Sequence, residues 1–245
     1  SVSNETVLST SGGICSNIFQ CLSGVLSDEI RRERVKNSSV GYTYEWDSRR
    51  TSLDNDEGLR FLISQDFGGL GGDDSFVKSK AKLIAQRRFF NDEITLRATL
   101  AGGAVSFSGA GSRATDRWLF DEDIMRGFAA DGIGPRDYNP LTNDALGGNY
   151  FATAKFEALF PLGLPEEYGL TGGVFYDIGN VWGLDKVSPA PGVTHYESGS
   201  FRHVAGVSIF WETPIGPMRL NWSKALEKEV QDIDQNFEFT ISTEF

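Results

Sequence analysis

The residues that could perform chemistry in this 245-residue chain are few. The two histidines, His195 and His203, do not belong to an HExxH zinc motif, and the sequence has neither a GxSxG nucleophile motif nor a Walker phosphate loop. The segment DNDEG starts like a calcium-binding loop, but Gly58 and Gln65 occupy positions where that loop needs ligands. These patterns favour a protein with no catalytic residue, no metal site and no cofactor.

Glu157 and Asp177 form the remaining acidic pair of interest, because they lie on two consecutive segments of alternating polarity. In NYFATAKFEALF, Glu157 shares the polar face with Lys155, and in GLTGGVFYDIGNVW, Asp177 shares a face with Phe175. Two facing carboxylates could act as the acid and base of a glycoside hydrolase. They could instead stay ionised and accept hydrogen bonds from an arginine, which would make them structural.

Cys15 and Cys21 lie close together in the segment GGICSNIFQCLSG. Their spacing in a loop-like region suits a small disulfide, which would indicate an oxidising compartment such as the periplasm or the cell exterior. The alternative is a pair of unpaired thiols. Without neighbouring histidines, the two cysteines do not predict a zinc site.

Composition narrows the class of protein further. The formal net charge of −11 argues against nucleic acid as a partner, because such binding needs surplus Lys and Arg. Aromatic residues make up 12% of the chain, with 18 Phe and 28 Gly, which favours β structure with many turns. The first residues, SVSNETVLST, lack the features of a signal peptide, so we expect either that one was removed or that the chain is a piece of a longer protein.

Alternation of apolar and polar residues predicts about nine strands, with a fragment of another near the N-terminus. The clearest is NFEFTISTEF, in which Phe237, Phe239, Ile241 and Phe245 share one face. The other predicted strands cover residues 38–47, 59–67, 76–90, 93–103, 149–160, 169–182, 201–211 and 218–226.

Short and long connections alternate along these strands, which is typical of an antiparallel transmembrane β-barrel of the outer membrane. Aromatic residues near several strand ends suit the interfacial girdles of such a barrel. A soluble β-sandwich would also alternate apolar and polar residues. Because nine strands leave two unpaired edges in lipid, we expect the barrel to continue before residue 1. Residues 1–36 are predicted to hold a partial strand and an external loop with the cysteine pair, and residues 37–245 the barrel, with a long loop at 108–148.

Five ordered motifs resemble the BamA family of outer-membrane β-barrel assembly proteins. They are IMRGF with GIGPRD, ALGGNYFATAKFEALFPL, FYDIGNVW, PIGPMRLNWSKAL and a terminal alternating strand that ends in Phe. The resemblance covers roughly residues 37–245. Asp121, Glu122 and Asp123 depart from the family, whose members often have a Gly-Gly pair there. The resemblance implies a sixteen-stranded barrel preceded by POTRA domains, of which this chain holds about nine to ten C-terminal strands.

The resemblance also implies a role for particular residues. The long loop folds back into the barrel, where Arg126 pairs with Glu157 and Asp177, while Gly127 allows a close turn and Phe128 packs against the wall. Otherwise Arg126 would be a solvated loop arginine. The terminal strand, with Phe237, Phe239, Ile241 and Phe245, would form one side of a lateral seam, although the same side chains could simply face lipid.

The function implied is the assembly and insertion of β-barrel proteins in the outer membrane of Gram-negative bacteria. An incoming strand would be templated at the seam while the membrane is locally destabilised. The partners implied are outer-membrane lipids, unfolded outer-membrane proteins and accessory lipoproteins of an assembly complex. A TamA-like barrel, a two-partner secretion transporter and a passive channel remain alternatives. Secretion transporters tend to have Tyr after the Arg-Gly, so Phe128 argues against them.

Overall fold

The structure is a computed structural model that describes most of the chain. The described residues are 2–5, 23, 25–26, 35–49, 57–69, 71, 75–91, 93–108, 111–121, 124–139, 142–185, 194–213 and 216–241. Cys15, Cys21 and Phe245 lie outside them, so the disulfide and the contribution of Phe245 stay predictions.

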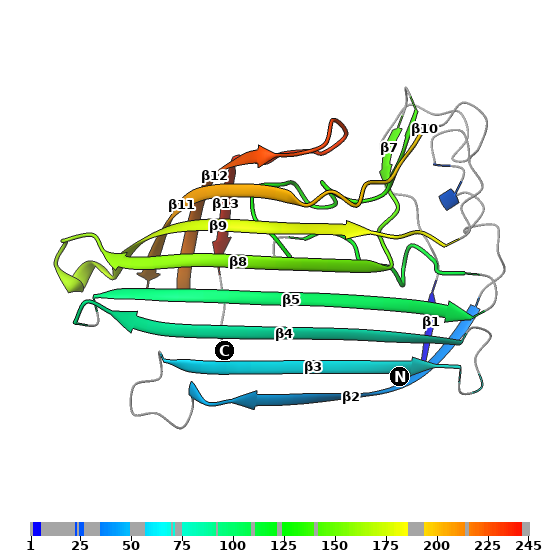
Figure 1. Ribbon diagram of the computed structural model, residues 1–245, viewed down its shortest axis with the longest axis horizontal. Coiled ribbons are helices and arrows are strands. Elements are labelled where there is room, and N and C mark those ends of the chain that lie inside the picture. Colours follow the sequence, from blue (N-terminus) through cyan, green and yellow to red (C-terminus); the bar gives the residue numbers. More distant parts are fainter. Residues whose placement is uncertain are drawn as a thin grey trace.

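Ten strands form one antiparallel sheet, and apart from the insertions each strand pairs with its neighbour in the chain (Figure 1). The strands are β1 (Val2–Glu5), β2 (Val35–Asp47), β3 (Gly58–Gly68), β4 (Ser75–Phe89), β5 (Ile94–Ser108), β8 (Tyr150–Pro161), β9 (Leu170–Trp182), β11 (Arg202–Thr213), β12 (Gly216–Glu227) and β13 (Phe237–Ile241). The predicted antiparallel sheet is therefore confirmed. Strands β3 and β4, with 11 and 15 residues, are long enough to cross a bilayer.

The two faces of the sheet differ in character because side chains alternate along each strand. On β9, Phe175 and Asp177 are buried, whereas Val174 and Tyr176 are exposed. The exposed face also carries Val40, Tyr42, Tyr44, Trp46, Phe156, Val207, Trp211 and Trp222. Figure 1 shows β11, β12 and β13 turning away from the plane of β2–β5, so that the sheet curls around the connection between β5 and β8. The apolar face is thus the outer one, and the polar face looks inward.

A small second sheet lies at the end of the strands where the long connections gather. It has the order β10-β6-β7 and consists of β6 (Arg136–Asn139), β7 (Thr142–Ala145) and β10 (Thr194–Tyr196). The sequence predicted only connections here, because strands of three and four residues are too short to show a period of two. The turn between β8 and β9 contains a short 3-10 helix, η3 (Glu166–Tyr168).

The apolar core lies between the long β5–β8 connection and the inner face of the sheet. The connection contributes Phe120, Ile124, Met125, Phe128 and Ile133, and the strands contribute Phe151, Phe175, Val181 and Val204. Each buried side chain of this size is worth roughly 1.5–3 kcal/mol. The connection is therefore a packed part of the fold. Among the described residues, no helix has the length and apolar character needed to span a membrane.

Candidate functional site: the docked loop

Two backbone hydrogen bonds join the two arms of the long connection near the inner wall of the sheet. The amide of Trp118 donates to the carbonyl of Gly148 at 2.8 Å, and the amide of Gly148 donates back at 2.9 Å. Further in, the Thr153 hydroxyl on β8 donates to the carbonyl of Ile124 at 2.7 Å. These bonds hold Trp118 and Ile124 against the wall, so Arg126, which follows shortly after, has a defined position.

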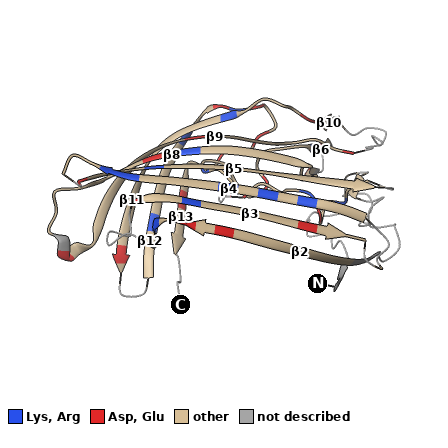
Figure 2. Ribbon diagram, turned by 60° about the horizontal axis from the view of Figure 1, so that its bottom comes forward, with Lys and Arg blue, Asp and Glu red and all other residues tan. Residues whose placement is uncertain are grey.

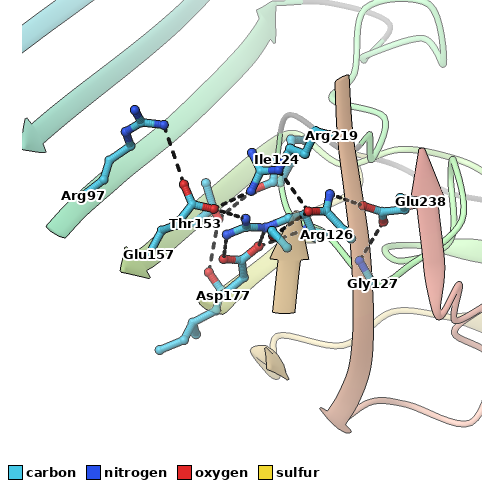
Figure 3. Close-up of polar contacts among 12 residues, drawn as sticks. Arg97, Ile124, Arg126, Gly127, Thr153, Glu157, Asp177, Arg219 and Glu238 are labelled. Carbon is cyan, nitrogen blue, oxygen red and sulfur yellow. Dashed lines mark hydrogen bonds and ion pairs between the residues drawn. The ribbon is translucent and has the colours of Figure 1, made fainter. Parts of the chain in front are cut away.

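Arg126 lies between the two carboxylates that the sequence singled out (Figure 3). Its Nε and NH2 groups donate to the two oxygens of Asp177 at 2.7 and 2.6 Å, and NH1 donates to Glu157 at 2.6 Å. The backbone amide of Arg126 also donates to Asp177, at 3.2 Å. The planar guanidinium suits this fork of acceptors in a way that a lysine could not.

Burial makes this ion pair energetically important. Arg126 is 5% exposed, Glu157 8% and Asp177 0%, and the guanidinium carbon lies 3.7 Å from the centre of the Phe175 ring. Removing one partner of a buried ion pair typically costs about 3–5 kcal/mol, because the other charge stays buried without compensation. The arrangement leaves the two carboxylates as saturated acceptors and not as a general acid and base.

Gly127 sits where a side chain would not fit. Its φ is +88°, and a Cβ added there would lie 2.7 Å from a methyl carbon of Val204 on β11. Its amide donates to Oε1 of Glu238 on β13 at 2.8 Å. Glycine therefore lets the backbone approach the wall and bond directly to the last strand.

Phe128 continues the contact with the last hairpin. Its ring packs edge-on against Phe120, with 6.0 Å between the ring centres, and its backbone forms an antiparallel bridge with Asp234. Next to this bridge, the amide of Gln235 donates to the carbonyl of Gly127 at 3.0 Å, and the amide of Ala129 donates to the carbonyl of Ile233 at 2.9 Å. The loop is thus joined to the β12–β13 connection through its backbone.

A second buried ion pair, which sequence reasoning missed, holds that same connection. Arg202 at the start of β11 donates through Nε and NH2 to Asp232 at 2.8 and 3.0 Å, and its NH1 donates to Asn180 on β9 at 2.6 Å. The side chains of Arg202 and Asp232 are 1% and 0% exposed. This pair anchors residues 228–236 to the sheet, independently of Arg126.

Two further arginines reach Glu157, and neither was singled out from the sequence. Arg219 on β12 donates from NH2 to Oε1 of Glu157, and NH1 of Arg97 on β5 lies 3.6 Å from Oε2. The alternation of MRLNWSKAL already placed Arg219 on the polar face, so the signal for an inward position was present. Its partner, however, lies three strands away in the sheet, beyond what local alternation can indicate.

Within the loop, the Asp131 carboxyl has a perturbed acidity. Burial raises the pKa of Asp131 above its ordinary value, and the nearby positive charge of Arg136 opposes that rise in part. The backbone of Asp131 also has a positive φ of 56°, a conformation that Asn adopts as readily as Asp.

The predicted seam residues lie on the outer face of the last strand. Phe237, Phe239 and Ile241 are 46%, 51% and 45% exposed. Strand β13 pairs with β12 from Trp222↔Phe237 to Met218↔Ile241. Its other edge pairs with no strand among the described residues. The geometry brings these side chains to a free edge, but it does not distinguish a seam from a lipid-facing surface.

The described residues contain no metal-binding cluster, and the two histidines contact other side chains. The described part of the chain includes no group of three or more His, Cys, Asp or Glu side chains arranged to hold a metal. His195 contacts Asp137 at 3.0 Å in the small sheet, and Nδ1 of His203 lies 2.7 Å from the Tyr176 hydroxyl. Both imidazoles lie outside the Arg126 cluster.

Comparison with known proteins gives a consistent result. Residues 3–245 match the Omp85 superfamily domain. The chain is 34% identical over 189 residues to the outer membrane protein assembly factor BamA of Neorickettsia risticii (strain Illinois), which covers 77% of this chain and 24% of that protein. It is 28% identical over 146 residues to the human sorting and assembly machinery component 50 homolog, which covers 58% of this chain and 30% of that protein.

The fold agrees with a solved relative. The crystal structure of BamA from Haemophilus ducreyi lacking POTRA domains 1-3 superimposes with a TM-score of 0.68 at 16% identity, covering 86% of this chain and 43% of that one. At this identity the likeness concerns the fold alone. This chain spans about a quarter of the length of the BamA relatives that it matches.

Proposed function

Because the chain belongs to the Omp85 superfamily, we propose that it is the C-terminal part of a barrel that assembles and inserts other β-barrel proteins into the outer membrane. The observation that carries this proposal is the similarity to an outer membrane protein assembly factor over 77% of the chain. The function needs no covalent catalysis, in keeping with carboxylates that are occupied by arginine.

In this proposal the free edge of β13 is the templating surface. An incoming strand adds to the unpaired backbone groups of the edge, as in other cases of strand addition. Phe237, Phe239 and Ile241 then face the same outer side as the apolar residues of the incoming strand. The seam opens laterally towards lipid, and the membrane beside it is locally destabilised.

The docked loop sets the position of that edge. Gly127 bonds to Glu238 on β13, and residues 127–132 bond to the connection that precedes β13. Arg126 holds this assembly on β8 and β9 through Glu157 and Asp177. Arg126 is therefore a positioning residue for the insertion of other β-barrel proteins, because it acts on the edge of β13 only through the loop.

The longer protein proposed here has a sixteen-stranded barrel with POTRA domains before it. Residues 37–245 form the C-terminal part of the barrel, and residues 1–36 contribute a partial strand and an external loop with Cys15 and Cys21. Its partners are outer-membrane lipids, unfolded outer-membrane proteins and accessory lipoproteins. Relatives include bacterial BamA proteins and the human sorting and assembly machinery component 50 homolog, and we place this chain in a bacterial outer membrane.

A passive channel is a weaker alternative, because the loop packs an apolar core against the inner face of β8, β9 and β11 instead of leaving that part of the face open. The test is to deplete the full-length protein in its native cell and to measure folded, heat-modifiable porin. Loss of porin on depletion, restored by wild type and not by Arg126→Ala that reaches the membrane, supports the proposal. Porin levels that do not change would rule out general assembly and would favour a TamA-like or secretion role.

A further inference from the structure

Beside the docked loop, a polar cavity of about 220 Å³ lies against the inner wall formed by β4, β5, β8, β12 and β13. Five cationic side chains line it: Lys82, Arg97, Arg126, Lys155 and Arg219. Only two acidic side chains do so, Glu157 and Glu238. Figure 2 shows several basic positions along β4, and in a protein whose net charge is −11 this local reversal of sign needs a physical explanation.

Glu157 is shared among more guanidinium groups than its charge can balance. Arg126 donates to it at 2.6 Å, Arg97 lies 3.6 Å away and Arg219 donates to the same oxygen as Arg126. Arg126 is already balanced, because two of its nitrogens bind Asp177. Glu157 is therefore left to neutralise both Arg97 and Arg219, and one positive charge remains.

Lys82 and Glu238, whose charges cancel, leave this excess unchanged. Glu238 accepts from the Gly127 amide at 2.8 Å and from Nδ2 of Asn221 at 3.4 Å. Within the described part of the chain, Lys82 has neither an ion pair nor a hydrogen bond. Lys155 takes part in interactions of its own and is left out of the count. The other four cations face three acids when Asp177 is included, which leaves an excess of one positive charge.

We propose that this cavity is a binding site for a carboxylate group carried by a polypeptide. Charge-assisted bonds from guanidinium and ammonium groups are the strong form of carboxylate recognition, and like charges held together at a half-buried site are relieved by an added anion. The volume equals that of about seven water molecules in the liquid, enough for one acidic side chain.

A lipid phosphate fits the same donors less well, because the cavity lies on the inner face of the sheet, opposite the face that carries the exposed apolar side chains. The carboxylate could come from the same polypeptide, outside residues 1–245, or from another protein that enters the lumen. The inference rests on the cavity alone and does not depend on the proposed assembly role.

Carbodiimide coupling distinguishes the two sources. The reagent joins a lysine amine to a contacting carboxylate without a spacer, so applied to the full-length protein in native membranes it would record the partner of Lys82. Mass spectrometry of the linked peptides identifies that partner. We expect an acidic residue from outside the cavity, on the same polypeptide or on a bound one. Coupling of Lys82 only to Glu157 or Glu238 would overturn the proposal.

If Lys82 stays uncoupled, the site must accept an added carboxylate. A tetraglutamate peptide is then titrated into the purified full-length protein in detergent at low salt, with tetraglutamine as the uncharged comparison. We expect saturable binding of tetraglutamate that weakens about tenfold in Lys82→Gln, about 1.4 kcal/mol, and returns in Lys82→Arg. Arg87→Gln, which removes a charge from the outer face of the same strand, leaves the affinity unchanged.

Both experiments together decide the matter. A carbodiimide link to an acid outside the cavity, or Lys82-dependent binding of tetraglutamate that weakens as salt is added, supports the site. Absence of both, or equal losses in Lys82→Gln and Arg87→Gln, refutes it. Thermal unfolding of each variant shows whether a loss of binding reflects loss of the fold.

Discussion

Replacing Arg126 with alanine tests the docked loop most sharply. The substitution removes three side-chain hydrogen bonds, two to Asp177 and one to Glu157. Glu157 keeps Arg97 and Arg219, but Asp177, which is fully buried, loses its guanidinium. The cost should therefore come mainly from Asp177 and amount to about 3–5 kcal/mol.

The assay is the free energy of unfolding of the full-length protein in detergent, followed by denaturant titration and by heat-modifiable mobility. Limited proteolysis of residues 111–139 reports on loop docking separately. Arg126→Lys keeps the charge but cannot form the fork, so we expect an intermediate loss of about 2 kcal/mol. Arg87→Ala, on the exposed outer face, is the matched control and should change stability by less than about 0.5 kcal/mol.

A double variant separates the charge effect from the loss of packing. Adding Asp177→Asn to Arg126→Ala removes the uncompensated charge, so the pair should cost at least about 2 kcal/mol less than the sum of the single changes. Strict additivity, or an Arg126→Ala protein as stable and as protease-resistant as wild type, would refute the reasoning.

Three other changes follow from the structure. Gly127→Ala should destabilise the protein by about 2–3 kcal/mol in denaturant titration, because it adds a steric clash to an unfavourable φ. Gly163 also has a positive φ, of +70°, but open space around it, so Gly163→Ala should cost only about 1 kcal/mol. Arg202→Gln should expose the Asp232 segment to protease and cost about 3–5 kcal/mol. The pKa of Asp131 is raised in the folded state, so its stabilising contribution is present below the unfolded pKa and is lost as pH rises through the folded pKa. Asp131→Asn should therefore raise the unfolding temperature at pH 7 and leave it unchanged near pH 3.

The sequence predicted the strands well because their two faces meet different surroundings. Alternation in 76–90 and 169–182 gave β4 and β9 to within one residue at each end. The same alternation placed Glu157 and Asp177 on the inner face. The prediction that they contact Arg126 came from the family motif and not from alternation, because Arg126 and Asp177 are 51 residues apart in the sequence.

The second ion pair was beyond local reasoning for a physical reason. Asp232 is one of several acidic residues in EKEVQDIDQ, and nothing in that segment marks it as the buried one. Its partner Arg202 opens a predicted strand, where a solvated arginine would look the same. Glu238 was not singled out either, although the alternation of NFEFTISTEF places it on the polar face of the last strand.

The central claim, that the docked loop supports strand templating, is tested most directly by reconstitution. The full-length protein is placed in lipid vesicles, and the rate at which an unfolded outer-membrane protein becomes folded and heat-modifiable is measured. The account predicts that wild type and Arg87→Ala accelerate folding to the same extent, while Arg126→Ala, correctly inserted, loses most of the acceleration. The account is contradicted if the client folds no faster with wild type than in empty vesicles. It is also contradicted if Arg126→Ala accelerates folding as much as wild type although its loop is protease-sensitive.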